Sequence, residues 1–528
     1  MDDPAFTRAI PGGEAVFLFG AIAMRRGGVT RALLQRMRLY ADTGIRVRLL
    51  LTGHSHDEDA EKAAIWRAWG LPESIEVRYF WREAAPGGGG APADPLTLAA
   101  EEPGLTSVPK VSAAGSYVRF YRDGLLAKTK HFDVGGRLRR IDHRDPERRL
   151  LSREYFDVQG RLVFADEMSP ETAKPALRRW FDRAGRCWLT CVNSPTGDLG
   201  ATVQHEPDAA SYDAFGQRVA VWIDDVLANA DTPVVFADRR NQDRALLAVT
   251  HSGARKVAVI HNCHTSRPHR ARDAVKATFL PLLEHIDALD AVVVLTHQQR
   301  DDIALRFQAA NLAVINHPTA PPPTLQVSRQ PGLLVAIARL EKQKRLDHAI
   351  RAFALAAPQV PGAVFHIYGT GSQAKVLKAL VTDLGISGLV QFRGFTDRSM
   401  EVFASASAAV LSSSFEGFPL VLTEAMAVGT PLVSYDINYG PAEVIRNEVD
   451  GLLVPPGDVK ALARAMVRVL RDRRFAARLG ERAREVVERF PAEIWTAEWT
   501  DLFARLTAGP RRPPSPAGGP SPEVPPIA

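Results

Sequence analysis

Two glutamates, Glu416 and Glu424, stand eight positions apart in the stretch Phe415–Thr430, and both carboxylates could contact a sugar. The apolar run Ala408–Leu411 precedes them, and a helix rich in Ala and Met is predicted after a Gly-Phe-Pro turn. We therefore expect Glu416 in the loop at the carboxyl end of a buried strand and Glu424 in the first turns of the helix. Ligands of open parallel sheets bind beside such loops. Two carboxylates there cannot both bind a phosphate, but they suit the hydroxyl groups of a ribose and a hexose.

Cations and glycines follow two strands that are predicted earlier in the chain. Arg339 comes after one strand, and Lys344 lies five positions on, at the start of the next helix. Such a loop suits a diphosphate, because Arg gives a forked contact and Lys a point charge. Gly369 and Gly371 follow the strand Ala363–Tyr368, where glycine either lets the backbone approach a ligand or forms a simple turn. Together with the glutamates, these residues fit a sugar nucleotide.

Two further loops extend this pattern. Arg393–Phe395 closes another predicted strand and could meet a base through backbone groups and the ring of Phe395. Asn438–Glu443 follows yet another strand. Each motif alone would often arise by chance. Five polar or glycine-rich loops after successive strands together favour a binding crevice along one rim of a sheet.

The order of segments predicts an α/β protein with two Rossmann-like lobes facing a cleft. Apolar strands alternate with helices in both halves, which is typical of parallel sheets. We expect a first lobe at residues 1–325 and a second, nucleotide-sugar-binding lobe at residues 326–485. A helix at 486–508 would return to the first lobe, and the Pro-rich tail 509–528 has too little apolar content to fold.

A different pattern interrupts the first lobe at about residues 114–190. Short, aromatic, alternating segments occur there, and three share Phe-Asp-x-x-Gly-Arg, beginning at Phe132, Phe156 and Phe181. Asp and Gly suit tight hairpin turns, so we predict an inserted set of antiparallel β-hairpins. The stretch 116–187 holds 17 Lys or Arg against 11 Asp or Glu, a difference of 6, which equals the net charge of the whole chain. This basic excess could attract an anionic partner or could simply solvate exposed strands.

Composition excludes several classes of protein. The 528 residues, with 46% hydrophobic and 24% charged, are ordinary for a protein with two substantial domains. No apolar run approaches the ~18 residues that span a bilayer, and the N-terminus lacks a secretory pattern, so we expect a cytoplasmic protein that could also associate with the inner face of the membrane. Cys187, Cys191 and Cys263 are expected as reduced thiols, since with His264 they lack two clean pairs of metal ligands.

The motifs resemble those of a known family. The order RLxxxK, YGxG, then EGFPLVLTE with AMAxGTPLV is similar to the retaining glycosyltransferases of the GT-B fold, family 4, with their E-x7-E motif, over Gly332 to about Pro456. RRGGVTRALLQRM resembles the glycine loop of that family, and the Trp-rich helix near the end resembles its returning helix. RLEKQKRLDHAI, YDINYGP and the inserted hairpins resemble the poly(glycerol-phosphate) α-glucosyltransferases, the wall-teichoic-acid GlcNAc transferases and the serine-rich adhesin glycosyltransferases.

The resemblance implies roles for individual residues. The donor would be UDP-glucose or UDP-GlcNAc, with Arg339 and Lys344 at the diphosphate, Glu424 at the ribose and Glu416 at the hydroxyls of the donor sugar. His261 matches a histidine near the donor sugar, although it could equally be a structural, hydrogen-bonded residue. The remaining donor contacts would come from Gly27, Gly28, Gly369, Gly371, Phe395, Phe418, Leu420 and Val421. No cofactor or metal is expected, because cationic side chains replace the metal.

The acceptor, on the side of the first lobe, stays open. An anionic polyol-phosphate polymer of the wall-teichoic-acid type suits the basic insertion, whereas a Ser-rich protein would depend less on salt. A glycosyltransferase of small molecules or lipids, a two-lobed epimerase, and a nucleotide-binding scaffold without activity are the alternatives. Asp238 is a candidate acceptor contact or a helix cap. We expect no nucleic-acid partner, and the insertion could also form a homo-oligomer.

Overall fold

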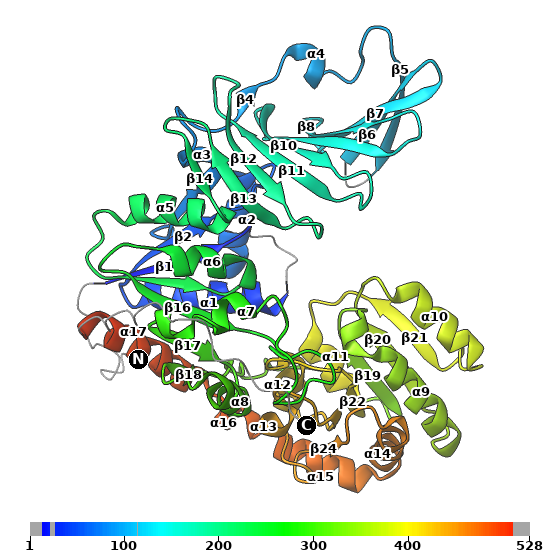
Figure 1. Cartoon of the computed structure of the whole chain (residues 1–528). Helices are drawn as coiled ribbons and strands as arrows, with labels where there is room; N and C mark the ends of the chain where they lie inside the picture. The colour runs from blue at the N-terminus through cyan, green and yellow to red at the C-terminus, as the bar shows by residue number, and fades with distance from the viewer. Residues whose placement is uncertain (1–12, 22–26, 113–114, 510–528) are drawn as a thin grey trace, which may run out of the picture. The chain divides into compact units, whose positions relative to one another are not determined.

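The computed structural model describes residues 13–21, 27–112 and 115–509 (Figure 1). The chain divides into two compact units. The first comprises Met1–Ala258, Ala288–Asp290 and Leu506–Ala528, and the second comprises Val259–Asp287 and Ala291–Arg505. The lobe boundary expected near residue 325 stays a prediction, and the Pro-rich tail after Gly509 lies outside the described residues.

The first parallel sheet has seven strands in the order β18-β17-β16-β15-β1-β2-β3. They are β1 (Glu14–Phe19), β2 (Arg46–Leu51), β3 (Glu76–Tyr79), β15 (Pro233–Ala237), β16 (Arg255–Ile260), β17 (Ala291–Val294) and β18 (Leu312–Val314). Every residue of β1, β15 and β16 is buried, which explains their nearly continuous apolar sequence. This strand order is doubly wound and places a switch point between β1 and β15.

Helices connect these strands, as the alternation in the sequence predicts. They are α1 (Gly28–Asp42), α2 (Glu58–Trp69), α5 (Phe215–Leu227), α6 (Asp243–Ala248) and α8 (His297–Phe307). In α1 the residues Leu33, Met37 and Tyr40 recur at helical spacing and are buried. The ring of Tyr40 lies 5.8 Å from that of Phe236 in β15, so this apolar face covers the sheet.

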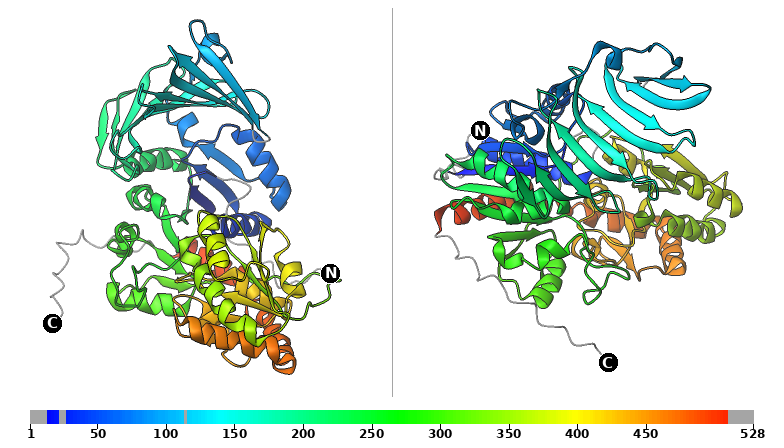
Figure 2. Two further views of the ribbon diagram at one scale, coloured as in Figure 1. Left: turned by 90° about the vertical axis from the view of Figure 1, so that its right-hand side faces the viewer. Right: turned by 45° about the horizontal axis from the view of Figure 1, so that its top comes forward.

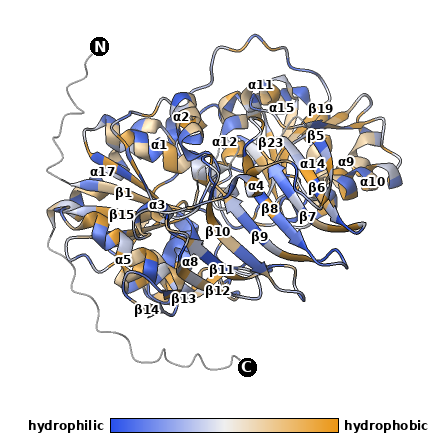
Figure 3. Ribbon diagram, turned by 90° about the horizontal axis from the view of Figure 1, so that it is seen from above, coloured by the Kyte–Doolittle hydropathy of each residue, from blue (hydrophilic) through white to orange (hydrophobic). Residues whose placement is uncertain are grey.

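An antiparallel sheet is inserted between β3 and β15, which confirms the predicted hairpins (Figures 1 and 2). Its strands pair in chain order: β5 (Thr106–Ser112), β6 (Gly115–Arg122), β7 (Leu125–Phe132), β8 (Leu138–Arg144), β9 (Leu150–Phe156), β10 (Arg161–Met168), β11 (Pro175–Phe181), β12 (Cys187–Asn193), β13 (Leu199–Gln204) and β14 (Ala210–Tyr212), with β4 (Ala91–Pro92) beside β10. The sheet extends past the predicted 114–190 at both ends. At its start, most side chains of β5 are exposed, so no buried alternation reveals that strand in the sequence. Figure 3 shows how hydrophilic much of β7 and β8 is.

The Phe-Asp-x-x-Gly-Arg repeat forms three hairpin turns with the same internal bonding. In one turn, Asp157 Oδ1 accepts hydrogen bonds from the backbone N–H groups of Gln159 and Arg161, both at 2.9 Å, and Oδ2 accepts one from Arg161 Nε at 2.7 Å. Asp133 with Arg137, and Asp182 with Arg186, repeat this pattern. The arginine of each repeat is therefore neutralised locally, which reduces the basic charge available to a partner.

The second parallel sheet has six strands in the order β21-β20-β19-β22-β23-β24. They are β19 (Leu333–Ile337), β20 (Val364–Tyr368), β21 (Val390–Gly394), β22 (Ala408–Leu411), β23 (Leu432–Tyr435) and β24 (Gly451–Val454). All of these neighbours pair in parallel. The order is again doubly wound, with its switch point between β19 and β22.

Helices cover both faces of this second sheet. Alternate residues of β19 point to opposite faces. Leu334 and Ala336 join a core with α9 (Leu346–Ala356), α10 (Ala374–Asp383) and α14 (Val459–Arg471), whereas Leu333 and Val335 join a core with α11 (Ser399–Ser405) and α12 (Leu420–Ala427). Because both faces are covered, the strands carry little polar sequence.

The Trp-rich helix is α17 (Ala492–Ala508), which lies within the expected 486–508. Trp499 and Phe503 are buried, and Trp495 is half-buried, so one face of this helix is largely covered. Across the described residues, the helices are too short or too polar to cross a membrane. All three cysteines are free thiols.

Candidate active site

The loops predicted to form a binding rim all begin at the same edge of the second sheet. Because β19 to β23 are parallel, their carboxyl ends meet at the same edge. β19 and β22 are neighbours in space but not in sequence, so a crevice is expected between the loops that follow them. Arg339 and Lys344 follow β19, and Glu416 follows β22.

Lys344 and Glu416 meet at this switch point. Lys344 ends a short 3₁₀ turn, Lys342–Lys344, and its Nζ lies 2.5 Å from Glu416 Oε1. Ser413 Oγ donates to the same oxygen at 2.6 Å, and Glu416 is only 7% exposed. The backbones are also joined, since the N–H of Ser414 donates to the carbonyl of Gln343 at 2.8 Å. Two loops that are 72 residues apart in sequence thus place a cation beside a carboxylate.

Arg339 lies in the loop after β19, and its side chain is exposed. The loop that carries Gly369 and Gly371 packs against the two residues that flank Arg339 in the sequence. A Cβ atom on Gly369 would lie 1.9 Å from the carbonyl oxygen of Ala338, and one on Gly371 would lie 2.4 Å from that of Leu340. Both positions therefore require glycine for the close approach of two loops. A contact of these glycines with a ligand stays a prediction.

The helix α12 holds four more of the predicted residues. Glu424 lies in its second turn and is half-buried. Leu420 and Val421 are its first two residues, where backbone N–H groups have no partner within the helix. Phe418 is buried, and its ring stands edge-on to Phe490 at 5.5 Å, so only its backbone could reach a donor.

His261, at the end of β16, lies against the Glu416 loop in the same unit. A Cβ atom on Gly417 would lie 2.1 Å from the carbonyl oxygen of His261, so the two backbones touch. The ring of His261 stacks on His317 with 5.8 Å between centroids. The structure therefore places the backbone of His261 against the loop that carries Glu416, and it assigns Gly417 a role that the motif EGFP signals but that the sequence analysis missed.

Lys276 is a second cation near Glu416 that sequence reasoning missed. Its Nζ lies 3.8 Å from the centroid of the Phe415 ring and donates to the carbonyl of Cys263 at 2.6 Å. Burial lowers the pKa of Lys276, and it lowers the pKa of the buried His264 to about 4, so that this histidine is uncharged at neutral pH. Lys276 lies in an irregular segment without a motif, which left no signal in the sequence.

The remaining predicted residues are Phe395, Gly27, Gly28 and Asp238. Phe395 follows β21 and is 68% exposed. Gly28 begins α1 and Gly27 precedes it, both exposed, while residues 22–26 of the predicted glycine loop lie outside the described residues. Asp238 is buried beside Arg36, with 2.5 Å between carboxylate and guanidinium, which favours a structural role over an acceptor contact.

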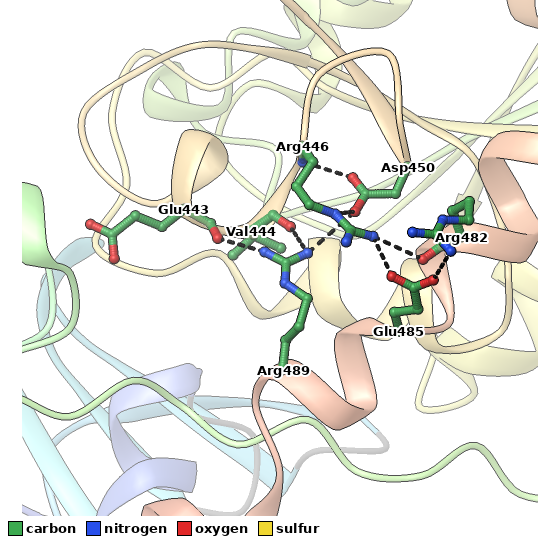
Figure 4. A network of polar contacts seen from close by, with 7 residues as sticks. All are labelled: Glu443, Val444, Arg446, Asp450, Arg482, Glu485 and Arg489. Carbon is green, nitrogen blue, oxygen red and sulfur yellow. Dashed lines mark hydrogen bonds and ion pairs between the residues drawn. The ribbon is translucent and has the colours of Figure 1, made fainter.

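A network of charges fixes the loop after β23. Arg489 donates to the carbonyl oxygens of Glu443 and Val444, both at 2.9 Å, and to Asp450 at 3.2 Å (Figure 4). Arg446 joins Asp450 to Glu485, at 2.6 and 2.8 Å. The carboxylate of Glu443 accepts a hydrogen bond from the N–H of Gln298 in the first turn of α8, at 2.9 Å. The short helix α13 (Pro441–Val444) is therefore held from both sides.

Comparison with known proteins identifies the segment that carries this site. Residues 323–486 match the family model described as Glycosyl transferases group 1. This segment contains the second parallel sheet and the residues Arg339, Lys344, Glu416 and Glu424.

Two curated relatives match larger parts of the chain. An exopolysaccharide phosphotransferase of Streptomyces coelicolor is 37% identical over 304 residues, which cover 57% of this chain and 31% of that protein. The poly(glycerol-phosphate) alpha-glucosyltransferase of Bacillus subtilis is 23% identical over 531 residues, covering 93% of this chain and 75% of that protein. The chain thus spans less than a third of the length of one relative and three quarters of the other.

A solved structure resembles nearly the whole fold. A variant of Staphylococcus aureus TarM, crystallised in complex with fondaparinux, alpha-GlcNAc-glycerol and UDP, aligns with a TM-score of 0.75 at 18% identity, over 93% of this chain and 99% of that chain. The expected GT-B fold, with two Rossmann-like parallel sheets and an antiparallel insertion, is confirmed.

Proposed function

We propose that this protein is a retaining glycosyltransferase that moves glucose or GlcNAc from a UDP-sugar to an acceptor hydroxyl. The observation that carries the proposal is the meeting of Lys344 and Glu416 at 2.5 Å on the switch point between β19 and β22. Both residues lie within the segment that matches the group 1 glycosyltransferases. A cation for the leaving diphosphate and a carboxylate for the sugar are then adjacent, as transfer from a sugar nucleotide requires.

Each residue of the site has a separate role in the proposed transfer. Arg339 and Lys344 stabilise the negative charge that develops on the diphosphate as the glycosidic bond breaks. Glu416 orients the donor sugar through its hydroxyls, and its contacts with Lys344 and Ser413 hold the carboxylate in place. Glu424 holds the ribose hydroxyls. These cations supply the charge that a metal ion supplies in other transferases, so the proposed reaction needs no metal.

Retention of configuration follows in this proposal from attack on the same face of the sugar. The departing phosphate oxygen accepts the proton of the acceptor hydroxyl, so no protein nucleophile is required. A double displacement would instead need a carboxylate directly beneath the sugar, where it could attack the anomeric carbon.

The acceptor that we favour is a polyol-phosphate polymer. The Bacillus subtilis relative is named for the transfer of glucose to poly(glycerol phosphate), and the match extends over 93% of this chain. The antiparallel insertion carries a basic excess that suits an anionic polymer. A Ser-rich protein acceptor is the alternative, and the inserted sheet could also mediate self-association.

A donor panel tests the proposal. Release of UDP from UDP-glucose, UDP-GlcNAc and UDP-galactose would be measured with glycerol-phosphate polymer, ribitol-phosphate polymer and a Ser-rich peptide as acceptors. We expect release with glucose or GlcNAc donors and stimulation by a polyol-phosphate polymer. Stimulation by the peptide alone would support the alternative acceptor, and no release with any donor would refute the proposed activity.

A matched pair of variants tests the assignment of the donor site. Glu424→Ala should weaken binding of the UDP-sugar, because a carboxylate that accepts two ribose hydroxyls is lost. Glu493→Ala, an exposed glutamate in the first turn of α17, should bind the donor like the unaltered protein. Equal donor affinities in the two variants would show that Glu424 does not hold the nucleotide.

A further inference from the structure

A cavity opens beside the Glu416 loop, within the second unit. Its volume is about 690 Å³, within the range that holds small-molecule ligands. The loop 267–271, Gln298 of α8, the start of α9 and the loops after β22, β23 and β24 form its walls. Among the described residues that line it, the predicted diphosphate ligands Arg339 and Lys344 do not occur. The cavity is therefore distinct from the proposed position of the donor diphosphate.

The lining of this cavity is positively charged. Arg267, Arg270 and Arg345 face a single carboxylate, Asp436, among the described lining residues. Arg345 is paired with Asp347, at 3.1 and 3.2 Å. Within the described part of the chain, the guanidinium groups of Arg267 and Arg270 have no hydrogen-bond or ion-pair partner, and both side chains are exposed. Two cations are thus available to an anion that enters.

Neutral hydrogen-bonding groups line the inner wall. Arg345 contacts the ring of His348, whose Nδ1 lies 3.1 Å from the hydroxyl of Tyr435. Burial lowers the pKa of His348, so that the ring is uncharged near neutral pH. Gln298 donates to the side-chain oxygen of Asn438 at 2.9 Å, which fixes the opposite wall. Such groups suit the hydroxyls of a polyol.

The cavity is joined to the reacting centre through one side chain. Ser413 lines the cavity, and its hydroxyl donates to Glu416 at 2.6 Å. The wall that carries Gln298 is fixed in turn by Glu443, which the network in Figure 4 holds in place. A ligand in the cavity therefore lies beside a rigid wall and one residue away from the proposed sugar-binding carboxylate.

We infer that this cavity binds a phosphate group of the acceptor, with Arg267 and Arg270 as the anion contacts and the inner wall holding the attached polyol. The inference rests on the proposed function, since it deepens the acceptor assignment. Residues of the second unit then recognise part of a polyol-phosphate polymer, in addition to the inserted sheet. A Ser-rich protein without phosphate would offer no anion to these two arginines.

Binding of sn-glycerol 3-phosphate tests the inference directly. Calorimetric titration of the full chain, saturated with UDP to fill the diphosphate site, would compare this ligand with glycerol. Arg267→Ala/Arg270→Ala should weaken binding of sn-glycerol 3-phosphate by roughly 10- to 100-fold, because charge-assisted hydrogen bonds are lost. The control Arg464→Ala/Arg474→Ala removes two exposed arginines, one from α14 and one from α15 (Arg473–Ala483), and should leave binding unchanged. Equal affinities in the two double variants overturn the inference.

A second variant changes the same site in the opposite direction. Asp436→Asn removes the carboxylate from the lining, so it should tighten binding of sn-glycerol 3-phosphate. This expectation holds even where the double arginine variant is poorly folded. Unchanged or weaker binding in Asp436→Asn counts against an anion site here.

Transfer assays separate a polymer phosphate from a free phosphate. The KM for poly(glycerol phosphate) should rise in Arg267→Ala/Arg270→Ala relative to the KM for glycerol. A polymer KM that stays unchanged while free glycerol phosphate binds more weakly overturns the acceptor assignment. UDP release without acceptor reports separately on the proposed function, because absent release from every donor would refute that function and leave the calorimetric result standing.

Discussion

The two parallel sheets share one strand order but use the charges at their switch points differently. At the first switch point, between β1 and β15, Asp238 and Arg36 form a pair in which the side chains are 0% and 1% exposed. At the second, between β19 and β22, Lys344 and Glu416 form a pair in which the side chains are 15% and 10% exposed, and Arg339 in the same loop as Lys344 is exposed. The first pair is fully buried, whereas the second pair keeps partial exposure and is the one that we propose to meet a ligand.

This difference shows that the fold alone does not locate chemistry. The doubly wound order predicts a crevice at each switch point. Only the residue types and their exposure distinguish a structural ion pair from a binding site. Around the second switch point, Gly369 and Gly371 let the loop after β20 pack on the loop after β19, and Gly417 lets the Glu416 loop pack on the backbone of His261.

The largest expected effect is on the stability of the first sheet. Asp238→Ala removes a buried carboxylate that contacts the buried guanidinium of Arg36, which should lower the free energy of unfolding by about 3–5 kcal/mol. Urea denaturation measures the loss. The control Asp42→Ala breaks the exposed pair with Arg38 and should cost less than about 1 kcal/mol. Similar urea midpoints in both variants would contradict the structural role of the buried pair.

The next largest effect is on turnover at the second switch point. Lys344→Ala removes a cation from the leaving diphosphate and should lower kcat by about 100- to 1000-fold, with a smaller loss of stability than Asp238→Ala. Lys342→Ala, two residues earlier and exposed, serves as the control and should retain turnover. If the two variants turn over UDP-sugar at the same rate, the charge at this switch point is structural, as in the first sheet.

Substitution of Gly371 should have an intermediate effect, and the quantity affected is stability. Gly371→Ala places a Cβ atom 2.4 Å from the carbonyl oxygen of Leu340 and should cost about 1–3 kcal/mol of stability, because the loops must separate. Gly388→Ala meets no atom within 4 Å and should be tolerated. Thermal unfolding of both variants tests whether tight loop packing, rather than chance, accounts for Gly371.

The smallest effect is expected at the start of α1. A Cβ atom on Gly27 meets no described atom within 4 Å, so Gly27→Ala should change stability by less than about 1 kcal/mol. The predicted contact of Gly27 with the donor implies that the added methyl group crowds the UDP-sugar, so donor binding should weaken a few-fold. An unchanged affinity for the UDP-sugar would show that the first switch point takes no part in donor binding.

Much of the fold could be predicted because its signals are local. Apolar runs give the parallel strands, and Asp and Gly at fixed positions give the hairpin turns at Phe132, Phe156 and Phe181. β5 could not be predicted, because its exposed side chains leave no buried alternation. β24 also leaves a weak signal in the sequence, because it is only four residues long and half of it is partly exposed.

The candidate site was predictable where residue types recur in a motif. Arg339, Lys344 and Glu416 lie on the predicted loops, and the motif EGFP contains Gly417. Lys276 and the cavity with Arg267 could not be predicted, because tertiary packing alone brings these irregular segments beside the Glu416 loop.

The hairpin turns of the inserted sheet have a consequence for how such a sheet could evolve. Each Asp closes its turn with backbone groups and an arginine only four residues away, so no turn relies on a neighbouring hairpin for its bonding. A duplication or deletion of one period, 24 residues from Phe132 to Phe156, would add or remove a self-contained hairpin and leave strand directions intact. The inserted sheet can therefore become wider or narrower by one hairpin at a time, while the parallel sheets stay unchanged.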